Sequence, residues 1–206
     1  HRLLVPELAE GLTITQSAGR IELRCDTARG PITMNAPREA VTLIDAKEIT
    51  IQSVASWCIR QLESHFPNSI DQLSLDFTPE EINGAMYHYS HGLKKHDGNC
   101  QRIAHGHRSK IQIFVDDIKD TQLEHNWCKR WQDIYIASEA DRVEKSSIEL
   151  SDQAMLNLTP DHQYFSYTAP QGRFDIAVES TVLDVVDCDS TVELLADFIA
   201  RQLKKE

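Results

Sequence analysis

Alternating apolar and polar positions, together with short apolar runs, predict strands along most of the chain. Gly30-Pro31 and Pro170-Gln171-Gly172 are typical of turns between strands. A β-branched run, KIQIFV at 110–115, follows two histidines and extends the strand that they begin. The predicted strands are residues 12–15, 20–25, 41–44, 73–77, 87–91, 105–115, 163–167 and 174–178.

Apolar residues with a period of 3.6 predict helices at 51–66, 122–137 and 191–205. Trp127 and Trp131, one turn apart, indicate a core-facing stripe rather than a ligand platform. Ser190 is the expected N-cap of the last helix, with Glu193 as its capping-box partner. The charged stretch 138–145 is predicted to be a solvated loop.

Residues 50–62 and 191–203 are similar at a constant offset and share Thr, Ala and an Arg-Gln-Leu ending. Each copy follows a short apolar strand that contains an aspartate. The similarity indicates a duplicated module whose copies pack together. Chance similarity between two amphipathic helices is the alternative.

The composition excludes several classes of protein. With 41% hydrophobic and 26% charged residues the chain is typical of a folded domain. No apolar run is long enough to cross a bilayer and no signal segment is evident, so no membrane partner and a cytoplasmic location are expected. The net charge of -11 argues against nucleic acid as a partner. Five cysteines without framework spacing indicate reduced thiols.

Three histidines are placed to meet at one point. His105 and His107 are two apart and share one face of a strand, and His91 ends an earlier strand on the face of Tyr87 and Tyr89. Three neutral imidazoles suit a zinc ion (Zn²⁺) with one open coordination position. A chance His-x-His pair in a chain with nine histidines is the alternative.

The strand Tyr89-Ser90-His91-Gly92-Leu93, a following cysteine and an HGH motif resemble the 6-pyruvoyl-tetrahydropterin synthase and 6-carboxytetrahydropterin synthase family, of the tunnelling (T-fold) superfamily. The resemblance implies that His91, His105 and His107 hold zinc and that Cys100 is the catalytic base. Four residues separate Cys100 from His105, a spacing that varies in the family.

Other segments extend the resemblance. Asp161 and His162 match an Asp-His pair whose histidine works with the cysteine as acid and base. Thr191 and Glu193 match a helix start that cradles the pterin ring, and Asp76 stands where the family has its pterin-anchoring glutamate. The sequence departs from the family pattern with Gln52 in place of a glutamate and Leu194 in place of an asparagine.

The resemblance implies an α+β fold of two tandem T-fold modules, in which antiparallel sheets carry helices on one face. Residues 1–83, which open with His1-Arg2-Leu3-Leu4, resemble the back part of a first module without its N-terminal strands. Residues 84–206 resemble a second module with the zinc motif and without its last strand. The family joins modules edge to edge around its active sites, so a homo-oligomer is expected.

The implied activity is that of a lyase, a zinc-dependent 6-carboxytetrahydropterin synthase acting on 7,8-dihydroneopterin triphosphate in queuosine (7-deazaguanine) biosynthesis. The alternatives are 6-pyruvoyl-tetrahydropterin synthase activity, metal-assisted hydrolysis with no role for Cys100, and a non-catalytic zinc- or pterin-binding module. Four cations near the histidines are candidates for the triphosphate: Lys94, Lys95, Arg102 and Arg108.

Overall fold

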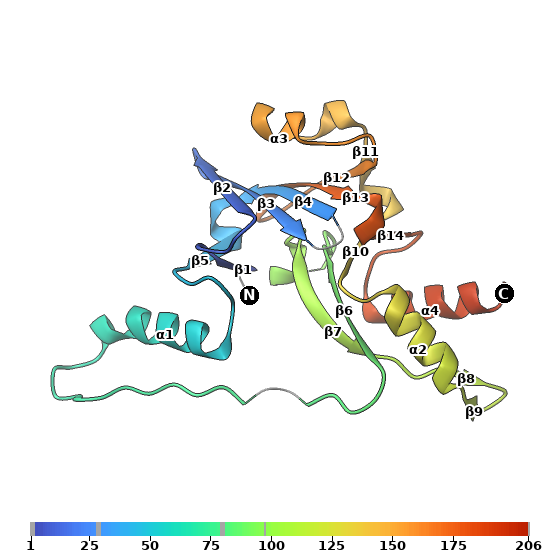
Figure 1. Ribbon diagram of the computed structural model, residues 1–206, viewed down its shortest axis with the longest axis horizontal. Helices are drawn as coiled ribbons and strands as arrows, with labels where there is room; N and C mark the ends of the chain where they lie inside the picture. The colour runs from blue at the N-terminus through green and yellow to red at the C-terminus, as the bar shows by residue number, and fades with distance from the viewer. Residues whose placement is uncertain (1–2, 28–29, 79–80, 97, 206) are drawn as a thin grey trace.

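The computed structural model has an α+β fold and describes residues 3–27, 30–78, 81–96 and 98–205 (Figure 1). Its strands are β1 (Leu3–Pro6), β2 (Leu12–Ser17), β3 (Arg20–Thr27), β4 (Gly30–Pro37), β5 (Val41–Ile44), β6 (Met86–His91), β7 (His105–Lys110), β8 (Phe114–Val115), β9 (Ile118–Lys119), β10 (Ile134–Ser138), β11 (Arg142–Val143), β12 (His162–Ala169), β13 (Gly172–Glu179) and β14 (Leu183–Val186). Its α-helices are α1 (Ile51–Leu62), α2 (Thr121–Arg130), α3 (Asp152–Leu156) and α4 (Val192–Leu203). None of the helices in the described ranges has the length and apolar character needed to cross a membrane.

Two sheets form the body of the molecule. One is an antiparallel sheet of six strands in the order β11-β12-β13-β4-β3-β2. Its central seam joins β13 to β4, with Asp175 opposite Asn35 and Val178 opposite Ile32. The other sheet has the order β14-β10-β6-β7, in which β10 runs parallel to both of its neighbours and β6 and β7 are antiparallel.

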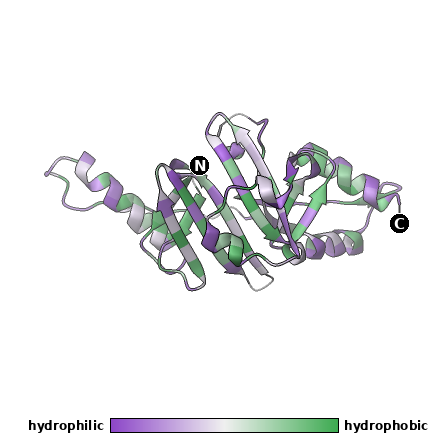
Figure 2. Cartoon of the chain, turned by 90° about the horizontal axis from the view of Figure 1, so that it is seen from above, coloured by the Kyte–Doolittle hydropathy of each residue, from purple (hydrophilic) through white to green (hydrophobic). Residues whose placement is uncertain are grey.

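Each face of the four-stranded sheet is buried against a different partner. Helices α2 and α4 cover one face, where Trp131 is fully buried and stacks on Phe198. On the other face Tyr135 of β10 packs on Phe165 of the six-stranded sheet. Figure 2 shows hydrophobic residues concentrated along the strands of the body. Alternate residues of β10 therefore point into two separate cores, whereas β6 contributes Tyr87 and Tyr89 to the core under the helices.

The order of elements in the first half of the chain recurs in the second half. Strands β3, β4 and β5 and helix α1 are followed later by β12, β13, β14 and α4 in the same order. Strand β5 pairs in parallel with β1, as β14 pairs with β10. The two helices differ in burial, because α4 buries Leu195, Phe198 and Ile199 whereas α1 buries no residue. Helix α1 and the extended segment after it project away from the body (Figures 1 and 2).

The predicted strand at 73–77 is wrong. These residues lie in the extended segment without a strand partner in the described ranges, and Leu75 and Phe77 are 37% and 38% exposed. Alternation alone does not make a strand, because its backbone groups need a neighbouring strand and its apolar side chains need a surface to cover.

Three other predicted boundaries are also wrong. The helix predicted to reach residue 137 ends at Arg130, because Asp133 has a φ of 55° and the run Ile134–Ser138 forms β10, where all five residues are buried. The strand predicted to reach residue 115 ends at Lys110. Gly30-Pro31, interpreted as a turn, begins β4 instead. Of the predicted opening segment, residues 1–2 lie outside the described ranges, and β1 begins at Leu3.

Candidate metal centre

Three imidazoles converge at one end of the β6–β7 hairpin. The strand register sets His91 opposite His105 and Tyr89 opposite His107. The ring centroid of His91 lies 4.4 Å from that of His105 and 4.8 Å from that of His107, and the centroids of His105 and His107 are 4.9 Å apart. One ring nitrogen from each residue falls into a set whose members all lie within 4.8 Å of one another. His91 is 1% exposed, whereas His107 is open to solvent.

Two of the three rings are held by their Nδ1 atoms. The Nδ1 of His91 lies 2.7 Å from the Ser190 hydroxyl oxygen, and the Nδ1 of His105 lies 2.8 Å from the backbone carbonyl oxygen of Arg102. The Nε2 atoms of His91 and His105 are buried and have no hydrogen-bond partner among the described residues. Buried polar atoms are usually paired, so two orphaned Nε2 atoms within one cluster indicate a missing ligand.

The donor set fits zinc. At a zinc–nitrogen distance of 2.0–2.1 Å, nitrogens of a tetrahedral site lie about 3.4 Å apart. The ring nitrogens of the three histidines all lie within 4.8 Å of one another. Rotation of the side chains can bring these nitrogens close enough together to bind one ion. Protein zinc sites with three imidazoles keep a fourth position for water or substrate. The group found among the described residues contains no carboxylate and no thiol.

The environment keeps the imidazoles neutral. Burial and the neighbouring imidazoles lower the pKa of His91 to about 2. Burial is the main cause that lowers the pKa of His105 to about 4, and burial also lowers the pKa of His107. A ring nitrogen binds metal only when it is unprotonated. The imidazoles of His91 and His105 therefore stay unprotonated, as metal binding requires, well below neutral pH.

These pKa values predict that the metal-free protein loses stability as the pH falls from about 6.5 toward 4. In the unfolded chain a histidine takes up its proton near pH 6.5, whereas folded His105 stays neutral down to about pH 4 and His91 to about pH 2. The unfolded state therefore binds more protons in this window, and the free energy of unfolding decreases with falling pH. Urea unfolding between pH 7 and pH 4.5 measures the slope. His105→Asn should show a shallower slope than the parent, and equal slopes would contradict the prediction.

Cys100 lies in a short 3₁₀ segment, Gly98–Gln101, within the connection from β6 to β7. The backbone carbonyl of Cys100 accepts a hydrogen bond of 3.0 Å from Leu93, two residues beyond His91. The thiol is half-buried and is not a member of the nitrogen cluster. The structure thus brings the cysteine-bearing loop to the His91 end of the hairpin without making the thiol a ligand.

Two tyrosines hold this loop. The Tyr167 hydroxyl donates to the carbonyl of Gln101 at 2.6 Å, and the Tyr135 hydroxyl donates to the carbonyl of Ile103 at 2.6 Å. The loop also packs closely on Gly92, where an added Cβ would lie 2.8 Å from the Ile103 Cα. Only glycine allows that approach. These residues were not identified from the sequence, because their contacts join elements distant along the chain.

Asp161 and His162 lie apart from the imidazole cluster. His162 begins β12 in the six-stranded sheet, opposite Glu179. Its Nδ1 accepts a hydrogen bond of 3.1 Å from the Thr159 backbone, and burial lowers its pKa. Asp161 is exposed, and its backbone carbonyl accepts from Ser180. Thr159 rather than Asp161 supplies the contacts that orient the imidazole.

The start of α4 reaches the cluster through one residue. The N-cap is Thr191, whose side chain accepts a hydrogen bond of 3.4 Å from the Leu194 backbone, so the predicted cap at Ser190 is wrong. Ser190 precedes the cap and contacts His91 instead. Glu193 lies in the exposed first turn of the helix. Thr191 and Glu193 are thus close in sequence to a residue that touches the candidate site.

Asp76 lies in the projecting segment and is exposed, and its carboxylate accepts a hydrogen bond of 2.9 Å from the Phe77 backbone. Two of the four candidate cations are already paired with acids. Lys94 forms an ion pair with the buried Asp141, and Lys95 lies 3.2 Å from Asp189. These pairs reduce the positive charge that Lys94 and Lys95 offer to a phosphate.

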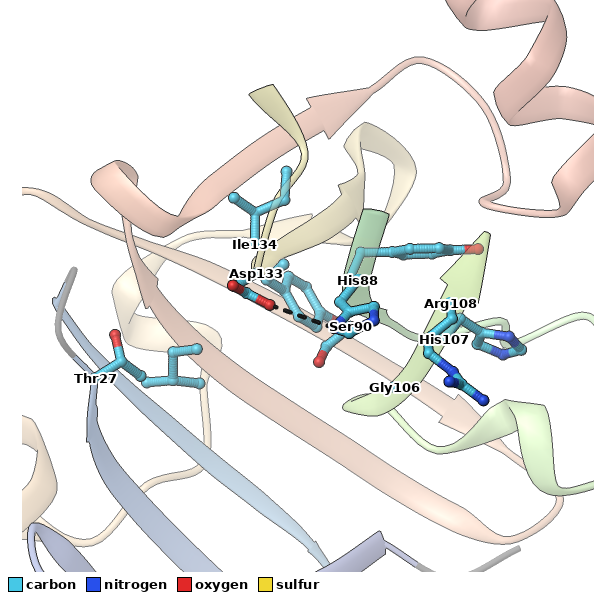
Figure 3. Close-up of a pocket in the computed structure, with 11 residues that line it drawn as sticks. Thr27, His88, Ser90, Gly106, His107, Arg108, Asp133 and Ile134 are labelled. Atoms are coloured by element: carbon cyan, nitrogen blue, oxygen red, sulfur yellow. Dashed lines mark ion pairs between the residues drawn. The ribbon is translucent and has the colours of Figure 1, made fainter. Parts of the chain in front are cut away.

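A cleft of about 500 Å³ lies beside the hairpin (Figure 3). His88 and Ser90 of β6 line it together with Asp133 and Thr27, and the Nδ1 of His88 lies 3.9 Å from a carboxylate oxygen of Asp133. Because side chains alternate along a strand, His88 points to the face of β6 opposite to that of His91. His107 also lines the cleft, so the cleft borders the imidazole cluster.

In a comparison with known families, the family model described as 6-pyruvoyl tetrahydropterin synthase matches residues 81–206. This range includes the whole β6–β7 hairpin, the loop with Cys100, and α4. Neither the curated proteins nor the solved structures give a match.

Proposed function

The chain belongs to the 6-pyruvoyl tetrahydropterin synthase family, and on that premise we propose that it is a zinc-dependent lyase acting on 7,8-dihydroneopterin triphosphate. We propose 6-carboxytetrahydropterin, a precursor in queuosine biosynthesis, as the product. The main support for the proposal is the pair of buried, unpartnered Nε2 atoms of His91 and His105 facing one another beside His107.

His91, His105 and His107 would hold the ion. When bound, zinc supplies Lewis acidity to oxygen atoms of a substrate. His91 is buried and His105 is partly buried, and both are held through Nδ1, which leaves their Nε2 atoms to bind the ion. The solvent-exposed side of His107 leaves the open coordination position accessible from outside.

Cys100 is proposed to accept a proton from the substrate side chain. The hydroxyls of Tyr135 and Tyr167 bind the backbone of its loop, and the backbone carbonyl of Cys100 accepts a hydrogen bond from Leu93, near the His91 end of the hairpin. General bases act only from hydrogen-bond reach of the proton that they remove. The two tyrosines therefore serve the reaction by limiting the movement of this loop.

Thr191 and Glu193 are proposed to bind the pterin ring at the start of α4. The amino-pyrimidinone edge of a pterin carries several donors, and a carboxylate accepts two of them at once. Asp161, His162 and Asp76 are not members of the imidazole cluster, and His162 belongs to the six-stranded sheet. We propose that they serve a site across an interface between modules or between copies, with His162 returning the proton.

We further propose that residues 1–83 and 84–206 are two tandem modules and that copies of the chain assemble into a homo-oligomer. The recurrent order of elements supports the duplication. The antiparallel pairing of β13 with β4 supports an edge-to-edge contact between the two modules. Metal-assisted hydrolysis is not favoured, because the imidazole cluster in the described ranges has no carboxylate to act as base.

The proposal predicts that the purified protein contains zinc and converts 7,8-dihydroneopterin triphosphate into a new pterin. Metal analysis followed by incubation and mass spectrometry of the pterin fraction tests both points. A product with the mass of 6-carboxytetrahydropterin supports the assignment, and 6-pyruvoyl-tetrahydropterin would assign the alternative product. Zinc without any conversion would indicate a non-catalytic module, and the absence of zinc binding would contradict the proposal.

A further inference from the structure

Ser190 occupies a position that neither a helix cap nor a surface role explains. It is 1% exposed, and the cap function belongs to its neighbour Thr191. Its hydroxyl oxygen lies 2.7 Å from the Nδ1 of His91 and 3.4 Å from the carbonyl oxygen of Gly92. The first of these contacts joins residues 99 positions apart in the sequence. Ser190 thus connects the end of β6 to the start of α4.

The direction of the two hydrogen bonds follows from the groups involved. A carbonyl oxygen only accepts, so the single hydroxyl proton of Ser190 is directed to Gly92. The hydroxyl oxygen then accepts from His91, which requires the proton of this imidazole to sit on Nδ1. The lone pair of His91 is consequently on Nε2, the buried atom that lacks a partner among the described residues.

His105 has the same tautomer as His91, but its acceptor is a backbone carbonyl. Its Nδ1 lies against the carbonyl oxygen of Arg102, which also only accepts. Both buried imidazoles therefore carry their proton on Nδ1 and their lone pair on Nε2, inside the cluster. In metal sites an acceptor on the second ring nitrogen fixes the tautomer and the ring orientation of a ligand.

We propose that Ser190 is a positioning residue of the metal centre, which selects the Nε2-coordinating tautomer of His91 and ties the first turn of α4 to the ion. The inference rests on the proposed zinc site. Thr191 and Glu193 follow Ser190 in the sequence, at the start of α4. Zinc bound through His91 and a ligand bound by Thr191 and Glu193 would therefore both favour the same position of Ser190. Such coupling is reciprocal, so each ligand raises the affinity for the other.

Zinc affinity of three variants, measured by chelator competition, tests the proposal. Ser190→Ala should bind zinc about 10- to 100-fold more weakly than the parent, as expected for loss of an outer partner. Ser190→Thr keeps a hydroxyl acceptor and should recover most of that loss. Ser151→Ala is the matched control, since it removes a hydroxyl that donates to Glu22 at 2.6 Å at the start of another helix. It should leave zinc affinity unchanged.

The tautomer of His91 in the metal-free protein is a second readout. Long-range ¹H–¹⁵N spectra of the metal-free parent should show the His91 proton on Nδ1, and Ser190→Ala should show a mixture. Equal zinc affinity of Ser190→Ala and the parent, or a parent proton on Nε2, would overturn the inference and leave the zinc proposal standing. A parent that binds no zinc would overturn both.

Discussion

Replacement of His91 by alanine is expected to lower zinc affinity by more than about 100-fold and to abolish pterin turnover. Changes in the outer partners of a metal ligand already cost 10- to 100-fold, so loss of a ligand itself costs more. Of the three candidate ligands His91 is the most deeply buried, and its neighbour in the cluster, His105, has an Nε2 atom without a partner among the described residues. Chelator competition and a turnover assay with 7,8-dihydroneopterin triphosphate measure the two effects.

His88→Ala is the matched control for this experiment. His88 lies on the same strand three residues earlier, points to the opposite face, and is half-exposed. The zinc affinity of His88→Ala should equal that of the parent. If His91→Ala bound zinc as tightly as His88→Ala does, the imidazole cluster would not be the metal site.

Replacement of Cys100 by alanine is expected to lower turnover by about 10²- to 10⁴-fold while zinc content stays unchanged. A positioned general base contributes a rate factor of this size. The zinc content should be retained because Cys100 is not a member of the imidazole cluster proposed to hold the ion. Single-turnover assays with metal analysis of the same sample measure both quantities.

Cys25→Ala provides the comparison for the cysteine substitution. Cys25 is an exposed cysteine in β3, remote from the β6–β7 hairpin in the sequence and in a different sheet. The Cys25→Ala variant should retain the turnover and the zinc content of the parent. Unchanged turnover in Cys100→Ala would remove the thiol from the mechanism and favour metal-assisted hydrolysis. Loss of zinc in that variant would instead show that Cys100 is a ligand.

The convergence of the three imidazoles was predictable from the sequence because it depends on short-range geometry. Two-residue spacing sets His105 and His107 on one face, and alternation with Tyr89 sets His91 on the matching face. The family assignment from the cysteine and the HGH motif is confirmed for residues 81–206, as is the α+β fold. The role of the Arg102 carbonyl was not predictable, since a backbone acceptor has no sequence signal.

Features that depend on distant contacts were missed or misplaced. Ser190 and Thr191 are both good helix caps, and the choice between them is settled by His91, far away in the sequence. The buried run Ile134–Ser138 fits a helix or a strand equally well, until parallel pairing with β6 and β14 selects a strand. The role of Asp161 and His162 stays a prediction, because a dipeptide match carries no information on which sheet the pair joins.

The seam between β4 and β13 has a consequence for biosynthesis. The paired residues Asn35 and Asp175 are 140 positions apart in the sequence, so the ribosome completes the β3–β4 hairpin long before its partner exists. At translation rates of about 5–20 residues per second, the backbone groups on this edge of β4 stay unpaired for roughly 7–28 s before β13 is synthesised. An edge of this kind is a template for pairing with a neighbouring nascent chain. Contacts so remote along the polypeptide also slow folding, so crowded polysomes and rapid overexpression are the conditions under which misassembly of this protein is expected.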